Sequence, residues 1–111
     1  MATQALNVFR TITATITNTP TTIYNAPAGF SAIVLGTQVA NISTGDAALT
    51  AWHVRGITAT ELVKNFEIPF GDAMGILSGK LVLQQGDGLR VQSAIDNTLK
   101  ITLSILESAN D

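Results

Sequence analysis

The stretch that decides the fold lies near the end of the chain: Leu99-Lys100-Ile101-Thr102-Leu103-Ser104-Ile105. Apolar and polar residues alternate at every step, so one side of the segment is apolar and the other is polar. Alternation with a period of two indicates a β-strand, because successive side chains of a strand point to opposite faces of the sheet. The pattern predicts an antiparallel strand with one face in the core and the other in solvent.

A second alternating segment lies at the other end of the chain, in residues 8–18. Its apolar face is interrupted by Arg10, and its other face holds only threonines: Thr11, Thr13, Thr15 and Thr17. β-Branched residues on both faces favour a strand, which ends at Thr19-Pro20 because proline cannot continue a ladder. Further strands are expected at residues 21–24, 30–42, 47–55, 62–68, 80–84 and 89–95.

The segments between these strands have the composition of turns and loops. Residues 25–29 are a predicted turn, residues 43–46 and 85–88 are predicted hairpin turns, and residues 96–97 are a tight turn. Residues 56–60 are expected to form a loop. Residues 73–79 are expected to form either one helical turn or an irregular apolar crossing, and their glycines argue against a stable helix. Gly36 predicts a bulge within its strand. The first half of residues 30–42 is apolar on both faces, which predicts a central strand covered on both sides.

About eight strands and no convincing long helix predict an all-β chain, an antiparallel β-sandwich of jelly-roll-like architecture. The expected organisation is an N-terminal arm at residues 1–7, a single β-sandwich domain at residues 8–107 and a polar tail at residues 108–111. The chain of 111 residues is long enough for one hydrophobic core.

Composition excludes several functional classes. The net charge of −2 argues against a nucleic-acid binder, and the absence of cysteine excludes disulfides and cysteine-based zinc sites. No signal peptide or membrane-spanning run is recognisable, so we expect no membrane partner and synthesis in a reducing cytoplasm. Charged residues make up only 13% of the chain, about half the usual share, while threonine occurs fifteen times.

Candidate chemistry is sparse. His53 is the only histidine, and Asp46, Asp72, Asp87 and Asp96 all lie in or beside turns, where aspartate accepts hydrogen bonds from nearby backbone N–H groups. No nucleophile–base pair, phosphate-binding motif or metal-ligand spacing is present. The sequence therefore predicts a protein that is not an enzyme, with no catalytic residues, no cofactor and no metal.

Two parts of the chain resemble a pattern of small virion proteins of tailed bacteriophages, in which a Tyr-x-Ala-Pro-Ala-Gly turn leads into an apolar strand. The first part is Tyr24-Asn25-Ala26-Pro27-Ala28-Gly29 with the strand that follows it. The second comprises Ile68-Pro69-Phe70-Gly71-Asp72-Ala73, residues 79–87 and the closing residues 101–107. The resemblance extends over roughly residues 20–107 and points to the jelly-roll cement, or decoration, proteins of phage heads. The threonines before Pro20 have no counterpart in that pattern.

This resemblance implies a structural virion protein, assembled in the host cytoplasm, that binds the outer surface of the phage head. Its implied partners are the major capsid protein, whose neighbouring subunits it staples, and itself, as a homodimer or another homo-oligomer. No catalytic residues come with the family.

Low charge is itself compatible with an assembly subunit, because threonine and serine can face a partner without the desolvation cost of charges. The strand at residues 8–18 or the N-terminal arm is expected to contact the shell or a sister subunit. The candidate interface residues are Thr11, Thr13, Thr15, Thr17, Trp52 and Arg55.

An alternative function remains open at this point. A phage tail or fibre β-sandwich module could bind a host-surface glycan through Trp52, although a lone tryptophan more often packs in or beside the core. The two functions differ in stoichiometry, because a cement protein is present in many more copies per particle than a receptor-binding module.

Overall fold

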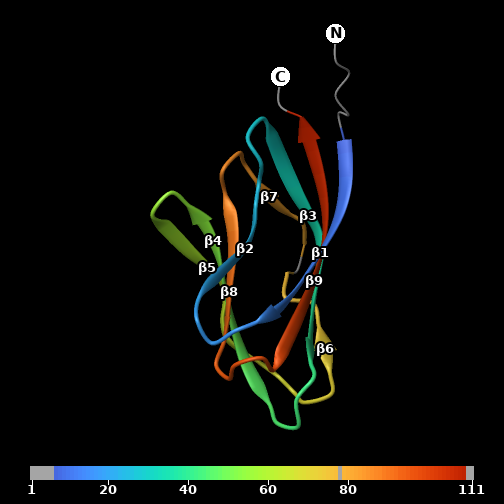
Figure 1. The fold of residues 1–111 in the computed structure, drawn as a ribbon, viewed down its shortest axis with the longest axis vertical. Coiled ribbons are helices and arrows are strands. Elements are labelled where there is room, and N and C mark those ends of the chain that lie inside the picture. Colours follow the sequence, from blue (N-terminus) through green and yellow to red (C-terminus); the bar gives the residue numbers. More distant parts are fainter. Residues whose placement is uncertain (1–6, 78, 110–111) are drawn as a thin grey trace.

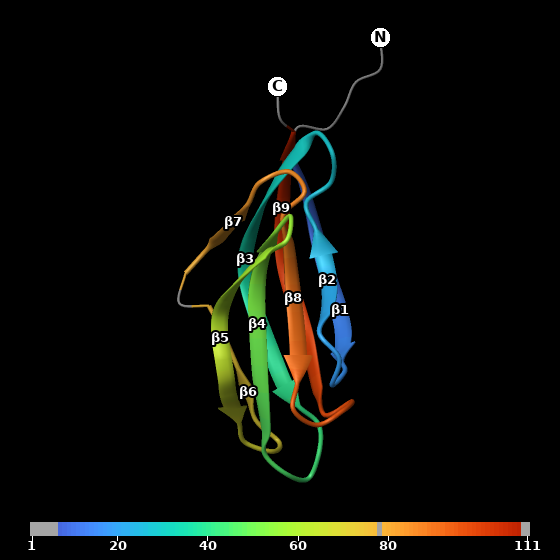
Figure 2. The ribbon, with the colours of Figure 1, turned by 90° about the vertical axis from the view of Figure 1, so that its left-hand side faces the viewer.

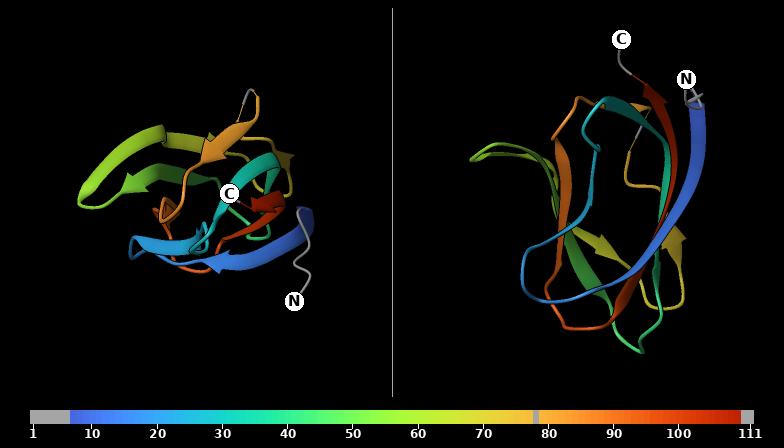
Figure 3. Two further views of the ribbon diagram at one scale, coloured as in Figure 1. Left: turned by 90° about the horizontal axis from the view of Figure 1, so that it is seen from above. Right: turned by 45° about the horizontal axis from the view of Figure 1, so that its top comes forward.

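A computed structural model describes residues 7–77 and 79–109, which form two antiparallel sheets packed face to face (Figure 1). Sheet A contains β1 (Asn7–Ile16), β9 (Leu99–Ala109) and β3 (Phe30–Asn41). The short strands β6 (Ala73–Met74) and β7 (Leu81–Leu83) follow one another along the edge of β3 that does not face β9. Sheet B contains β2 (Thr21–Asn25), β8 (Gly88–Ser93), β4 (Ala47–Arg55) and β5 (Thr58–Ile68). Figure 2 views the molecule from the side of sheet B, and Figure 3 shows the two layers from above. No helix of the described residues is long and apolar enough to cross a membrane.

The strand order is that of a jelly roll, which confirms the predicted all-β sandwich. The chain passes between the sheets at most connections, so each sheet is assembled from strands distant in sequence. β6 and β7 share one strand position, because β6 pairs with the end of β3 and β7 with its beginning. The described residues therefore contain nine strands where about eight were predicted, and the additional strand, β6, lies in the segment expected to form a helical turn or an irregular crossing.

The predicted hairpins at residues 43–46 and 85–88 are wrong. Each of these turns joins strands of different sheets, as does the turn at residues 96–97. Turn residues reverse the chain without specifying which strand the next one pairs with, so local sequence could not distinguish the two cases. A hairpin instead connects β4 with β5, where a loop was expected, and Gly56 at its tip has a φ of 60°. This hairpin extends away from the rest of the sandwich (Figures 1 and 3).

β9 lies in the middle of sheet A, where it pairs with both β1 and β3. Its apolar side chains Leu99, Ile101, Leu103 and Ile105 are at most 1% exposed, which confirms the face predicted from the alternation. A register shift between Val34 and Gly36 confirms the predicted bulge. The expectation that β3 is covered on both faces is wrong, because Leu35 is exposed and Ile33 only half-buried on the outer side.

The ends of the domain differ slightly from the predicted boundaries. β1 begins at Asn7 and ends at Ile16, and β9 continues through Ala109, so the first residues of the predicted polar tail belong to this strand. Of the predicted N-terminal arm, residues 1–6 lie outside the described part of the chain.

Gly88 and Gly36 make a matched pair for testing how closely β2 and β8 approach each other within sheet B. A Cβ on Gly88 would lie 2.6 Å from Asn25 Oδ1 and 3.2 Å from the Tyr24 carbonyl oxygen, whereas a Cβ on Gly36 would meet nothing within 4 Å. We expect Gly88→Ala to lower the free energy of unfolding by about 1–3 kcal/mol, because backbone must move. Gly36→Ala should be neutral or stabilising by less than about 1 kcal/mol. Denaturant titration measures the free energy of unfolding of both variants. Equal effects of the two substitutions would contradict this account of β2–β8 packing.

Candidate functional site

An apolar row crosses the outer face of sheet A. The strand register places four outward-pointing side chains next to one another, and we call this set the apolar row: Phe9, Leu106, Ile33 and Val82. Phe9 is 75% exposed and Val82 is 56% exposed, while the two inner members are half-buried by their neighbours. Leu35, at the bulge of β3, lies beside the row and is also exposed.

The rest of this outer face is polar but almost free of charge. Going along β1, Thr11 lies opposite Ser104, Thr13 opposite Thr102 and Thr15 opposite Lys100. On the other side of β9, Gln38 and Ala40 of β3 complete the same rows. Lys100 is the one charged residue that points outward from the described strands of sheet A. A shallow hollow of about 420 Å³ lies over this end of the face, lined by Thr13, Ala14, Thr15, Lys100, Ile101 and Thr102.

The arginine of β1 points to the other side of the sheet. Arg10 Nε donates a hydrogen bond to Glu107 Oε1 at 2.7 Å, and the Tyr24 hydroxyl donates to the second carboxylate oxygen. Glu107 is 3% exposed, and burial alone would raise its pKa, but the hydrogen bonds from Arg10 and Tyr24 outweigh burial and hold the pKa below its ordinary value. This buried carboxylate joins β9 and β1 to β2 of the opposite sheet and keeps the Arg10 charge off the outer face.

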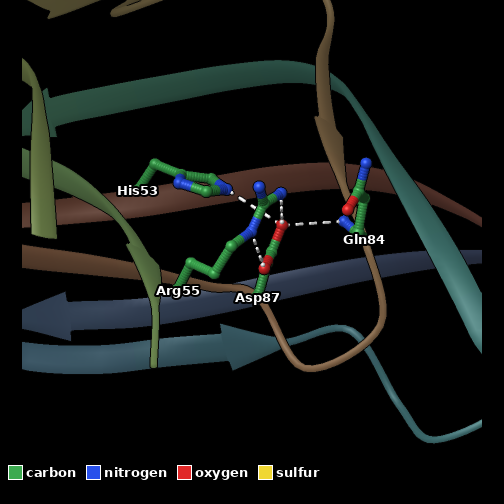
Figure 4. Close-up of polar contacts among 4 residues, drawn as sticks. All are labelled: His53, Arg55, Gln84 and Asp87. Carbon is green, nitrogen blue, oxygen red and sulfur yellow. Dashed lines mark hydrogen bonds and ion pairs between the residues drawn. The ribbon is translucent and has the colours of Figure 1, made fainter. Parts of the chain in front are cut away.

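A second buried carboxylate lies at the same end of the sandwich, in the turn before β8 (Figure 4). Arg55 donates to Asp87 through Nε at 2.9 Å and Nη2 at 2.7 Å, and the Gln84 backbone N–H donates at 2.9 Å. His53 Nε2 lies 3.0 Å from the same carboxylate, of which 2% is exposed. The Arg55 hydrogen bonds hold the pKa of Asp87 far below its ordinary value, against the opposing effect of burial.

The structure separates the predicted interface residues into distinct environments. Thr11, Thr13 and Thr15 share the outer face of sheet A, whereas Thr17 lies beyond the end of β1, where its hydroxyl donates to the Thr19 carbonyl oxygen. Arg55 is engaged by Asp87 on sheet B. The candidate residues therefore do not form one continuous surface.

Trp52 lies on the outer face of sheet B. It is half-buried, and its cross-strand neighbours are Arg90 on β8 and Glu61 on β5. The expectation that Trp52 packs in or beside the core is wrong, because the buried side of β4 is the one formed by Leu49 and Ala51.

Sequence reasoning missed the apolar row and both ion-pair clusters. Phe9 could have indicated the apolar row, because its position in the alternation puts it on the same face of the strand as the threonines. Assigning Leu106, Ile33 and Val82 to the same row required the pairing of β9 with β1 and β3 and of β7 with β3, which no local pattern gives. Glu107 and Asp87 carried no signal, since a tail or turn position does not reveal burial.

The described residues contain no group of three or more histidine, cysteine, aspartate or glutamate side chains able to hold a metal ion. Every buried side-chain nitrogen and oxygen described in the structure has a hydrogen-bond partner. The two carboxylate clusters are thus satisfied internally by arginine, tyrosine, histidine and backbone groups.

No protein-family model matches this chain, and no curated protein matches it by sequence. Among solved structures, it is similar to a protein of Bacillus endospore appendages, described as a novel family of disulfide-linked pili. The identity is 13%, the match covers 100% of this chain and 98% of that one, and the TM-score is 0.58. At this identity the similarity shows the fold alone.

Two crystal structures of a pentameric capsid protein isolated from metagenomic phage sequences also match. They are 24% identical to this chain over 96% of its length, and the match covers 64% and 65% of their own chains. Their TM-scores are 0.45 and 0.44, and a similarity at that level carries no argument about this chain.

The Asp87 cluster gives a prediction about acid stability. The pKa of Asp87 is lower in the folded chain than its ordinary value of 3.8. The ionised carboxylate therefore adds to the free energy of unfolding fully above pH 3.8, and this stabilisation is lost as the pH falls below that value. At pH 7, Asp87→Asn should lower the free energy of unfolding by about 2–4 kcal/mol, because Arg55 and His53 lose a buried anion. The difference from wild type should shrink as the pH is lowered below about 4.

The control is Glu67→Gln, which removes an exposed carboxylate of β5 and should change stability by less than about 0.5 kcal/mol. Chemical denaturation at several pH values measures both variants. A difference between Asp87→Asn and wild type that stays constant down to acid pH would contradict the assigned role of the cluster.

Proposed function

We propose that this chain is a structural virion protein: a cement, or decoration, protein that binds the outside of a tailed-phage head and staples neighbouring major capsid subunits. The observation that carries this proposal is the nearly uncharged outer face of sheet A, whose one outward charge among the described residues is Lys100. Such a face is suited to being covered by protein in an assembly.

Desolvation is the physical reason. Covering a charged side chain without a partner costs several kcal/mol, whereas threonine and serine hydroxyls and apolar side chains are covered at much lower cost. Interface cores are accordingly depleted in charge. Sheet B of the same chain provides the comparison, because its outer face holds Glu61, Glu67 and Arg90. The outer face of sheet A therefore has fewer charged residues than the outer face of sheet B, so the shortage of charge is not spread evenly over the surface.

The resemblance to phage cement proteins directs the proposal to a capsid. The segments that carry it lie in β2, β3, β7, β9 and the connection from β5 to β6. The Tyr24–Gly29 motif enters β3 through a turn in which the Phe30 N–H donates to the Pro27 carbonyl oxygen at 3.0 Å. Gly29 has a φ of 82° in this turn, a conformation that glycine adopts without strain. A repeated shell also multiplies weak contacts through avidity, so each copy can bind with modest affinity.

A second candidate function is supported by Trp52. Its half-buried ring on the outer face of sheet B, with Arg90 and Glu61 as cross-strand neighbours, combines an apolar surface with hydrogen-bonding groups. A sugar ring has both apolar and hydroxyl-bearing sides, so this combination is suited to binding one. A tail or fibre module that recognises a host-surface glycan needs such a site. Glycan-array binding that is lost in Trp52→Ala and kept in Phe70→Ala would favour this function over the cement protein.

Copy number in purified particles tests the main proposal. In virions of the phage that encodes the chain, quantitative mass spectrometry should find on the order of hundreds of copies per particle, because a shell repeats each contact many times. The protein should also remain on tail-less heads, and an image reconstruction should place it outside the major capsid shell. A protein confined to tails and present in tens of copies would support the glycan-binding alternative. Its absence from virions would overturn both.

A further inference from the structure

We propose that the outer face of sheet A binds the same face of a second copy of this chain, with the two apolar rows stacked against each other. This inference rests on the proposed function, because it names the partner of the face that is covered in the assembly. It makes a claim that the proposed function does not, namely that the contact forms between purified chains without any shell.

The apolar row is the first reason. Phe9, Leu106, Ile33 and Val82 cross four adjacent strands without a polar interruption, and Leu35 widens the patch at the bulge. Single exposed apolar residues are ordinary, but a contiguous patch across a sheet marks an interaction site. Sheet B covers the inner face of sheet A. No described strand covers the outer face, because every strand outside sheet A belongs to sheet B.

Charge identifies the partner. In a contact related by a two-fold axis, each face meets its own composition, so net charge on the face would meet charge of the same sign. A face made for a different protein has no such restriction and commonly uses charges complementary to those of its partner. Among the described residues, the outer face of sheet A has a single charge, Lys100, whereas that of sheet B has charges of both signs. Neutrality restricted to one face is the pattern expected for contact with a second copy.

The area of the face is sufficient. β1 has ten residues, and at about 3.4 Å per residue the face is about 34 Å long. Four strand positions at about 4.8 Å spacing make it about 15 Å wide, which gives roughly 500 Å² in projection and about 1,000 Å² for two copies. This lies at the lower limit for a specific interface, so we expect a dimer with a dissociation constant in the micromolar range.

Two two-fold axes would stack the rows with the sheets aligned. An axis parallel to the row places each side chain over its own copy, Phe9 over Phe9, whereas an axis parallel to the strands reverses the order of the row. The axis parallel to the strands packs the two faces more evenly, because it sets the large Phe9 ring against the smaller Val82 at both ends of the row. Phe9 then lies over Val82 of the second copy, and Leu106 lies over Ile33. Lys100 is six residues from Leu106 along β9, about 20 Å away, so the two lysines lie at the rim of the contact, where water screens their repulsion.

Sedimentation equilibrium of the purified chain tests the self-contact. Wild type should associate reversibly to a dimer, and Phe9→Lys should weaken that association at least about tenfold, because it buries an unpaired charge in the row. Phe70→Lys is the matched control, since Phe70 is 61% exposed but lies in the turn between β5 and β6, beside the end of β3 that is far from Ile33. It should leave the dissociation constant unchanged. Thermal melts of both variants verify that each is folded.

A charge-pair experiment tests the predicted geometry. Val82→Glu alone should also weaken the homodimer, because it adds a carboxylate opposite an apolar ring. Mixing Phe9→Lys with Val82→Glu should restore a mixed dimer, since the axis brings the new lysine of one chain over the new glutamate of the other while the second Phe9–Val82 contact stays intact. Restoration should weaken as salt is raised.

Each outcome decides the inference. A wild-type chain that stays monomeric at high micromolar concentration, or a dimer that Phe9→Lys leaves unchanged, would overturn it. Failure of the mixed pair to associate would reject the strand-parallel axis. The proposed function is judged separately: a monomer found in high copy on phage heads would retain the cement function and assign the face to the shell, whereas a dimer absent from virions would retain the self-contact alone.

Discussion

The strict alternation of β9 is the constraint on which the rest of the structure depends. This strand lies between β1 and β3, so its register determines the facing of both neighbours. A slip by one residue would turn Ile101 and Leu103 toward solvent and bring Lys100 into the core, which makes the observed register strongly preferred. The same register decides what faces outward. It aligns Phe9 with Leu106 and Ile33, and it aligns the threonines of β1 with polar residues of β9.

The buried carboxylates depend on this arrangement and also reinforce it. Glu107 follows the inward phase of β9, so it enters the sandwich where only a paired anion is tolerated, and Arg10 and Tyr24 supply the pairing from two different sheets. Asp87 has the same role for the turn before β8, which it ties to β4 through Arg55 and His53. Both anchors lie at one end of the molecule and join segments that the chain order keeps far apart.

The sequence predicted individual strands better than their pairing. Alternation located β1, β3, β4 and β9, and composition and strand spacing indicated a jelly-roll-like sandwich, because period and turn chemistry are local properties. Whether the turn at residues 43–46 closes a hairpin or crosses between sheets depends on which distant strand is free to pair, and that is a property of the whole fold. The candidate site shows the same division: the threonine face was predictable from one strand, whereas a row built from β1, β9, β3 and β7 was not.

A sheet face that is covered in an assembly must also be soluble while the chain is free, and threonine meets both requirements. An entirely apolar face would expose a large patch while the chain is still free, next to β1, an edge strand already able to pair with other chains. A charged face would keep the free chain soluble but would resist being covered. Thr11, Thr13 and Thr15 are exposed, and each side chain has a hydroxyl group that water hydrates and a methyl group that a partner covers at low cost, so both states are accessible. One apolar residue from each strand is then enough, because the apolar row determines where the two faces meet. The uncharged residues around it can be covered by the partner without a large desolvation cost.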